Sequence, residues 1–173
     1  MNKKKRNINN KGMTLIELLM FIAISSIILA MVMISYNVVN NANATKAARR
    51  LETVIRTART QSMAKGQEEG KLTLTVLDGN VYATIGDPAT AESQQICNSG
   101  VTVTGILCAD ANDYKNARVG TPFTSYQLTF NTSGTVREVM GSTDYNKFII
   151  NRGNRSFEII VYSDTGSVET NMF

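Results

Sequence analysis

A run of apolar residues dominates the first part of the chain. Residues 18–36 read LLMFIAISSIILAMVMISY without a charged side chain, and the flanking charges are Glu17 before the run and Lys46 after it. As an α-helix that rises ~1.5 Å per residue, this run would be about 28 Å long, close to the ~30 Å hydrocarbon thickness of a bilayer. The pattern therefore predicts a membrane-spanning helix.

The helical period continues beyond the apolar run, but on one face only. Small and apolar side chains recur at three- and four-residue steps, at Ala44, Ala47, Ala48, Leu51, Val54, Ile55, Ala58 and Ser62. Gly66 and Gly70 then interrupt the pattern. We expect a single helix over residues 13–65, ~80 Å long. Its first part, 13–36, spans the membrane, and its second part, 37–65, packs the apolar stripe on a head.

Short β-prone runs separated by turn signals fill the rest of the chain. Asp78-Gly79, Ser133-Gly134 and residues 164–166 are typical of tight turns. Strands are expected at residues 71–77, 81–85, 101–107, 126–131, 135–140, 148–151 and 157–162, with an edge strand at 167–170. The predicted fold class is α+β, with one long N-terminal helix packed on an antiparallel β-sheet head of residues 66–173.

Composition narrows the function classes. The chain of 173 residues contains no His, and its two Cys cannot form a four-ligand metal site. Histidine-based acid–base chemistry, Ser-His and Cys-His nucleophiles and the commonest zinc ligand are therefore excluded. We expect a protein that is not an enzyme and that needs no cofactor or metal.

The net charge of +4 is concentrated at the N-terminus. Residues 1–12 carry no acid and five basic side chains, so the rest of the chain has a net charge of −1; the five are Lys3, Lys4, Lys5, Arg6 and Lys11. Basic residues ahead of an apolar helix stay in the cytoplasm. The charge pattern predicts a single-pass protein of the cytoplasmic membrane whose head is extracytoplasmic.

Three kinds of N-terminal segment fit this arrangement. A cleaved secretory signal would use Ala42-Asn43-Ala44, but its apolar region should be only ~7–15 residues long. A plain signal anchor fits the length and the charge. It leaves Glu17 unexplained, because a carboxylate beside an apolar membrane helix costs free energy. The third kind accounts for this carboxylate.

Residues 11–19, KGMTLIELL, resemble the processing site of type IV pilins and type II secretion pseudopilins. The resemblance implies that prepilin peptidase cleaves after Gly12, removes the basic leader 1–12 and methylates the new N-terminus at Met13. It also implies that Glu17 serves assembly by pairing with an amine when subunits dock, since buried charges are tolerated when paired. Met13 departs from the Phe usual in the family, and the helix lacks the proline of many relatives.

A narrower resemblance covers most of the chain. Residues 47–76 look like the GspH/FimT group of minor pseudopilins and minor pilins, and residues 128–136 and 157–168 resemble its last strands; the matching positions in the helix are Arg56, Ala58, Arg59, Met63 and Ala64. This implies a type IV pilin-like fold and a subunit that assembles into, or initiates, a type IV pilus or a type II secretion pseudopilus.

The resemblance also implies partners and a location. The partners are other pilins or pseudopilins bound through the N-terminal helix, prepilin peptidase, the inner-membrane assembly platform and the lipid bilayer. The protein would lie first in the cytoplasmic membrane and then in a pilus or pseudopilus, at the cell surface or in the cell envelope.

Basic residues gather on the second half of the predicted helix, at Arg49, Arg50, Arg56, Arg59 and Lys65. One interpretation is a solvated face that meets acidic loops of the head or of a neighbouring subunit, since residues 66–173 have a net charge of −5. Another is a strip that contacts DNA phosphates, which would make the chain a DNA-uptake receptor of a competence system. An extracytoplasmic binding domain on a signal anchor is a further hypothesis.

Cys97 and Cys108 lie close together in the sequence, in a part of the chain that we expect in an oxidising compartment. A structural disulfide is the preferred interpretation, and two reduced thiols or a redox-active pair are the alternatives. Asp87, Asp110 and Asp113 have the ligand chemistry of a calcium site, but the acidic stretch is too short for a calcium loop. No metal site is expected.

Overall fold

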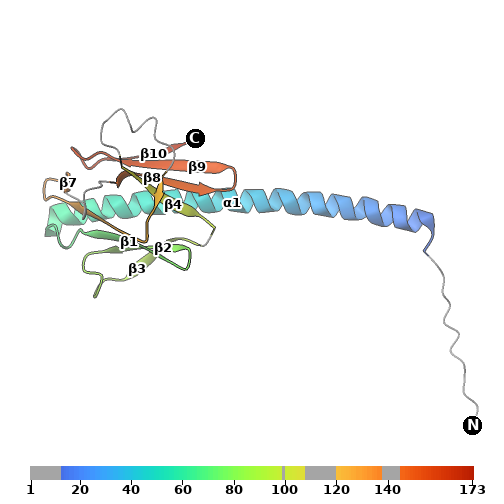
Figure 1. The fold of residues 1–173 in the computed structure, drawn as a ribbon, viewed down its shortest axis with the longest axis horizontal. Coiled ribbons are helices and arrows are strands. Elements are labelled where there is room, and N and C mark those ends of the chain that lie inside the picture. The colour runs from blue at the N-terminus through green and yellow to red at the C-terminus, as the bar shows by residue number, and fades with distance from the viewer. Residues whose placement is uncertain (1–12, 99, 108–119, 138–144) are drawn as a thin grey trace, which may run out of the picture. The chain divides into compact units, whose positions relative to one another are not determined.

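A computed structural model describes residues 13–98, 100–107, 120–137 and 145–173 of the chain. The protein divides into two compact units, Met1–Tyr36 and Asn37–Phe173. The first unit contains the N-terminal part of helix α1 (Leu15–Lys65). The second unit, which we call the head, contains the rest of α1 and every strand of the described residues (Figure 1).

Among the described residues of the first unit, the chain itself covers no large apolar side chain. From Leu15 to Tyr36, every large apolar residue leaves at least 50% of its surface exposed. The hydroxyls of Ser26 and Ser35 donate to helix carbonyls one turn back, at 2.7 and 3.0 Å, so they need no other partner. In length and composition, α1 is able to cross a membrane.

In the head, the predicted stripe of α1 is buried. Its apolar members expose at most 3% of their surface; they are Ala44, Ala47, Ala48, Leu51, Val54, Ile55 and Ala58. The four alanines let the strands approach the helix closely, while Leu51 and Ile55 fill the space between the strands. Each of these two larger side chains stabilises the fold by ~1.5–3 kcal/mol through burial. The prediction of an amphipathic helix packed on the head is confirmed.

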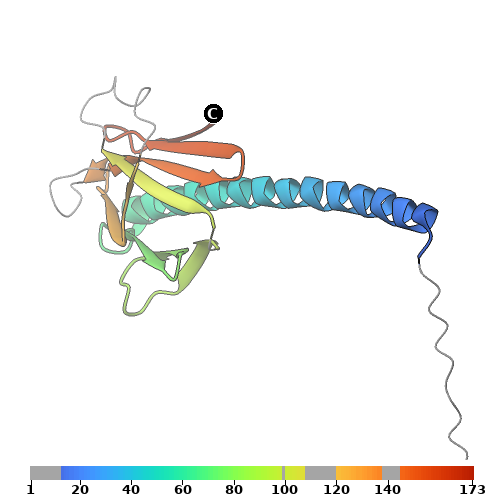
Figure 2. The same cartoon turned by 45° about the vertical axis from the view of Figure 1, so that its right-hand side comes forward.

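Two antiparallel sheets, each with five strands among the described residues, pack on this part of α1. Sheet A has the order β3-β2-β1-β6-β7 and consists of β1 (Leu72–Leu77), β2 (Asn80–Ile85), β3 (Ser93–Cys97), β6 (Ser125–Phe130) and β7 (Val136–Arg137). Sheet B has the order β10-β9-β8-β4-β5 and consists of β4 (Thr102–Leu107), β5 (Thr121–Pro122), β8 (Tyr145–Arg152), β9 (Arg155–Val161) and β10 (Val168–Met172). The green strands of sheet A and the orange and red strands of sheet B lie on different sides of the helix (Figure 1, Figure 2).

Both sheets contribute alternate residues to one core around α1. Leu74 and Phe130 of sheet A and Phe148 and Ile150 of sheet B are fully buried in it. The ring of Phe148 meets Tyr126 of sheet A edge to face, with ring centroids 5.5 Å apart, a favoured aromatic geometry. The helix and the two sheets therefore share a single hydrophobic core.

The structure confirms the predicted helix and most of the predicted strands. The helix ends at Lys65 as expected but begins at Leu15 instead of residue 13. Every predicted strand has a counterpart, although residues 138–140 of one of them lie outside the described residues. The sequence does not predict β3 or β5, and the head has two sheets where one was expected.

The segment after α1 turns back tightly onto the helix. A Cβ atom at Gly70 would overlap the Oγ and backbone nitrogen of Ser62 and would lie 2.5 Å from the carbonyl oxygen of Ala58. Two of these three atoms belong to the helix backbone, which cannot move aside easily. Glycine at position 70 therefore allows β1 to start against the last turns of α1.

We expect Gly70→Ala to lower the free energy of unfolding of the head by ~1–3 kcal/mol, because overpacking displaces the helix from the strand. Urea denaturation of the full-length protein in detergent measures this change. The neighbouring Glu69 is exposed, and Glu69→Ala is the control, with an expected effect within about 0.5 kcal/mol. Equal stability of the two variants would contradict the role of Gly70.

Candidate functional site

The N-terminus of α1 is closed by two side chains that bond to each other. Glu17 Oε2 accepts hydrogen bonds from the backbone N–H and the hydroxyl of Thr14, at 2.8 and 2.9 Å, and the Glu17 N–H donates to Thr14 Oγ1 at 3.3 Å. This reciprocal arrangement is a capping box. It explains why the helix begins at Leu15. Thr14 and Glu17 have the T-x-x-E spacing of this motif, so the role of Thr14 is encoded in the local sequence.

The capping box fixes the direction of the Glu17 carboxylate. Both bonds to Thr14 reach the same oxygen, Oε2, which leaves Oε1 available to another donor. Glu17 and the preceding Met13 are exposed. The carboxylate is therefore oriented by its own helix and remains accessible at the start of an uncovered apolar surface. Gly12, the predicted cleavage position, lies outside the described residues.

Three of the five basic residues predicted to form a face of α1 donate hydrogen bonds to backbone carbonyls of the strands and turns of the head. Arg50 Nη1 donates to the Gln95 carbonyl at 3.3 Å, Arg56 Nη2 to the Val168 carbonyl at 2.6 Å, and Arg59 Nη2 to the Thr165 carbonyl at 2.8 Å. Among the described residues, no acidic loop of the head pairs with these arginines, and the one carboxylate in contact with them is Glu52, one turn before Arg56 on the helix, at 2.9 Å. Contact with acidic loops of a neighbouring subunit stays a prediction. Arg49 and Lys65 are exposed.

Arg59 joins turns from both sheets. Its Nε donates to the Gly134 carbonyl in the turn after β6, at 3.0 Å, and its Nη2 reaches the turn after β9. The two turns touch, since a Cβ atom at Gly166 would overlap the Gly134 carbonyl oxygen. Gly134 and Gly166 have φ of 84° and 63°, a region that favours glycine. The turn-bearing segments 128–136 and 157–168, which are far apart in sequence, therefore meet at one arginine.

Cys97 ends β3 with a buried side chain. Its Sγ lies 3.9 Å from the Val101 carbonyl oxygen, and burial raises the pKa of the thiol. Cys108 lies outside the described residues, so the predicted disulfide stays a prediction.

The structure describes one of the three candidate calcium ligands, Asp87. Asp87 Oδ1 accepts a hydrogen bond from the Ala89 N–H at 2.9 Å, which is a local turn contact. Asp110 and Asp113 lie outside the described residues.

One comparison identifies the N-terminal segment. Residues 7–33 match the model of the prokaryotic N-terminal methylation motif, the signal of type IV pilins. No curated protein and no solved structure matches the chain. The match supports a type IV pilin-like protein that prepilin peptidase processes and that has a methylated N-terminus. It also implies interaction with other pilins and with the peptidase, and the apolar helix suggests a membrane-anchored pilin.

We expect Thr14→Val to loosen the first turn of α1, because loss of an N-cap costs ~0.5–2 kcal/mol. Hydrogen exchange of the amides of residues 15–18, measured by mass spectrometry on the protein in micelles, should become about 2- to 30-fold faster. Thr14→Ser keeps the hydroxyl and should exchange as the unmodified protein does. Equal exchange in the Val and Ser variants would show that the capping box contributes nothing.

We expect Arg59→Ala to destabilise the head by ~1.5–3 kcal/mol, since hydrogen bonds to a charged group are lost and two turns are released. Chemical denaturation of the full-length protein measures the change. Arg49→Ala removes the same charge from the same helix at an exposed position, and should change the stability by no more than about 0.5 kcal/mol. Similar losses of stability in both variants would mean that the positive charge of α1, and not the hydrogen bonds of Arg59, stabilises the head.

Proposed function

We propose that this chain is a minor pilin or pseudopilin of the GspH/FimT type. It would be cleaved after Gly12, methylated at Met13, held in the membrane by the first part of α1, and then built into or used to initiate a filament. The observation that carries the proposal is a methylation motif on a helix whose first half is uncovered and whose second half forms the core of a β-rich head.

In this function, the uncovered half of α1 is covered first by one apolar environment and then by another. A continuous apolar surface from Leu15 to Tyr36 is unstable in water. A bilayer can cover it before assembly, and the helices of other subunits can cover it afterwards. Glu17 is the one charged residue of this segment. A carboxylate there is stable among packed helices only with a partner charge, such as the amine at residue 13 of a neighbouring subunit.

The head supports a structural role better than a catalytic one. The chain contains no histidine, and the polar contacts of the arginines on α1 hold elements of the head together. We propose that the extracytoplasmic head contacts other subunits or cargo, that the inner-membrane assembly platform extracts the protein, and that the filament is a type II secretion pseudopilus or a type IV pilus. The resemblance of residues 47–76 to the GspH/FimT group supports the narrower grouping.

Mass spectrometry of the mature N-terminus tests processing. The expected first peptide begins with N-methylated Met13. An intact Met1 would leave a plain membrane anchor, and a start at Thr45 would mean a secreted head. Either result would remove Glu17 from the mechanism.

Glu17→Ala tests assembly separately from processing. We expect cleavage after Gly12 to continue, because Glu17 lies five residues beyond the cut, while co-purification with filament subunits falls to background. Glu68 is an exposed glutamate of the head, and Glu68→Ala should co-purify at the level of the unmodified protein. Normal recovery of the Glu17 variant in filaments would overturn the assembly role.

DNA uptake is the alternative function, and the salt dependence of DNA binding distinguishes the two. If all five basic residues of the predicted strip contact phosphates, log Kd should change with log salt concentration with a slope near 4.5 in magnitude. We expect a slope of no more than about 2, because the strip residues outside the head contacts described above are Arg49 and Lys65. A steep slope that Arg49→Gln reduces by about one would favour the DNA-uptake function.

A further inference from the structure

The uncovered apolar surface of α1 continues past the first unit and ends at Asn40. Val38 and Val39 belong to the head and expose 62% and 56% of their surface. Asn40 exposes 5% and is the first buried residue of α1 in the part of the chain that the structure describes. The apolar surface that needs a covering from outside the chain therefore reaches into the head and stops at one polar residue.

The turn between β8 and β9 covers Asn40. Arg152 Nε donates to Asn40 Oδ1 at 3.0 Å. A Cβ atom at Gly153 would lie 3.3 Å from the Cβ of Asn40 and 3.4 Å from Oδ1 of Asn41, so the backbone of the turn lies directly on the helix. Gly153 has a φ of 63°, a value that favours glycine. The tip of this hairpin is therefore fixed to α1 at the point where the uncovered surface ends.

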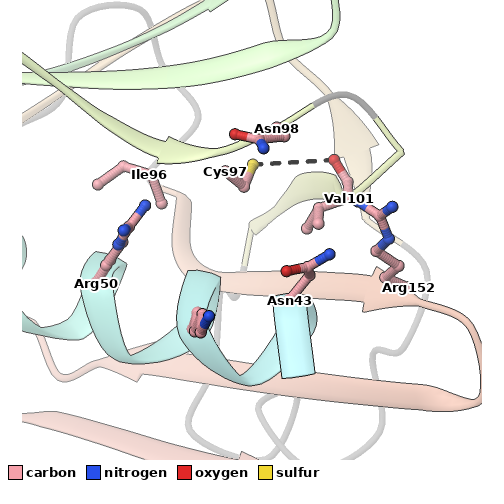
Figure 3. Close-up of a pocket in the computed structure, with 8 residues that line it drawn as sticks. Asn43, Arg50, Ile96, Cys97, Asn98, Val101 and Arg152 are labelled. Atoms are coloured by element: carbon pink, nitrogen blue, oxygen red, sulfur yellow. Dashed lines mark hydrogen bonds between the residues drawn. The ribbon is translucent and has the colours of Figure 1, made fainter. Parts of the chain in front are cut away.

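The side chain of Arg152 fastens the turn inside the head. Its guanidinium packs against Gly100, because a Cβ atom at Gly100 would lie 3.4 Å from Nη1. Figure 3 shows Arg152 beside Val101, in the connection between β3 and β4. Arg152 thus connects the turn to the helix and to this connection, and the outward-facing residues of the turn are the ones that follow it.

Arg155 gives the exposed side of the turn a positive charge. It is exposed, and the two ion pairs of the described residues do not involve it. Residues 37–45 and 148–157, the two segments that meet here, contain no acidic side chain. The next acid along β9, Glu158, is paired with Lys147 at 2.7 Å. A guanidinium without a carboxylate partner therefore lies at the tip of the hairpin, next to the exposed valines of α1.

The depth of this turn in a membrane follows from the length of the apolar run. Tyr36 is the last residue of the run, and tyrosine is typical of the membrane interface. Asn40 follows four residues later, which is ~6 Å of helix, and the headgroup layer on each side of the hydrocarbon is about 5–8 Å thick. When α1 spans a bilayer, a turn that lies on Asn40 is therefore at the depth of the headgroups.

We propose that the β8–β9 turn docks on the phospholipid headgroups of the bilayer that holds α1. Arg155 binds a lipid phosphate, since a guanidinium presents its donors in a fork that fits phosphate oxygens, and the exposed amide of Asn154 can donate beside it. Val38 and Val39 lie at the boundary with the acyl chains. The docked turn limits how far the head can tilt over the bilayer before assembly. This proposal rests on insertion of α1, which is part of the function proposed above.

Tryptophan fluorescence tests the docking, because the chain contains no tryptophan of its own. The full-length protein with Asn154→Trp is placed in vesicles of phosphatidylcholine and phosphatidylglycerol in which part of the headgroups carry a nitroxide quencher. Ser163→Trp is the matched control, an exposed position beyond the other end of β9, ~23 Å along the strand. We expect strong quenching of the tryptophan at position 154. Quenching at position 163 should not exceed that of free N-acetyltryptophanamide in the same vesicles.

Arg155→Gln, introduced together with Asn154→Trp, tests the phosphate contact. Loss of one cation beside an anionic surface should lower the ratio of docked to undocked turns by about 5-fold, and the quenching should fall with it. Lys65→Gln removes a positive charge from an exposed position at the end of α1 and should leave the quenching unchanged. Equal effects of the two substitutions would indicate a general attraction between a cationic protein and an anionic surface, and would overturn the contact of Arg155.

Phe21→Trp separates this proposal from the function on which it rests. Phe21 lies in the apolar run with 66% of its surface exposed, and lipids brominated on their acyl chains should quench a tryptophan there. Quenching at position 21 with equal quenching at positions 154 and 163 would overturn the docking and leave the membrane anchor in place. No quenching at position 21 would overturn both. Asn151→Trp, at an exposed position beside the turn, repeats the measurement if an unfolding curve shows that Asn154→Trp destabilises the head.

Discussion

The structure depends on how the apolar surface of one 51-residue helix is covered. In the head, two sheets bury a stripe of alanines, Leu51 and Ile55, and the small side chains allow both sheets to reach the helix. From Leu15 to Tyr36 in the first unit, nothing in the described part of the chain covers the large apolar side chains. The same helix is therefore part of the hydrophobic core along one part and has an exposed apolar surface along the other. An uncovered surface of this length requires a bilayer or other helices.

Much of this could be predicted from the sequence, because periodicity is a local signal. The stripe and the alternating strands follow from spacing alone. β3 escapes prediction since Ser93, Gln94 and Gln95 are polar and not buried, so no alternation marks it. β5 has two residues, one of them Pro122. The division into two sheets depends on pairings such as β1 with β6, far apart along the chain, and local patterns do not contain that information.

The same distinction between local and long-range information applies to the functional residues. Glu17 is recognisable because a carboxylate at an apolar boundary is unusual, and the capping box with Thr14 is also encoded locally. The hydrogen-bond partners of the arginines are not encoded locally. Arg56 and Arg59 reach carbonyls more than 70 residues away, in turns and strand ends whose positions only the fold determines. From sequence these residues look like a charged surface, whereas in the structure they connect the helix to both sheets.

The basic residues of α1 thus meet two different surroundings. Near the end of the helix, the turns of both sheets offer several carbonyl oxygens, and Arg59 alone bonds to two of them. Earlier in the helix, Arg50 donates to one strand carbonyl, that of Gln95, at 3.3 Å. Arg59 is therefore tied to the turns at two points, whereas Arg50 has one such bond. The arginines of α1 therefore connect the helix to the strands to different degrees, and the double connection lies where turns of both sheets meet.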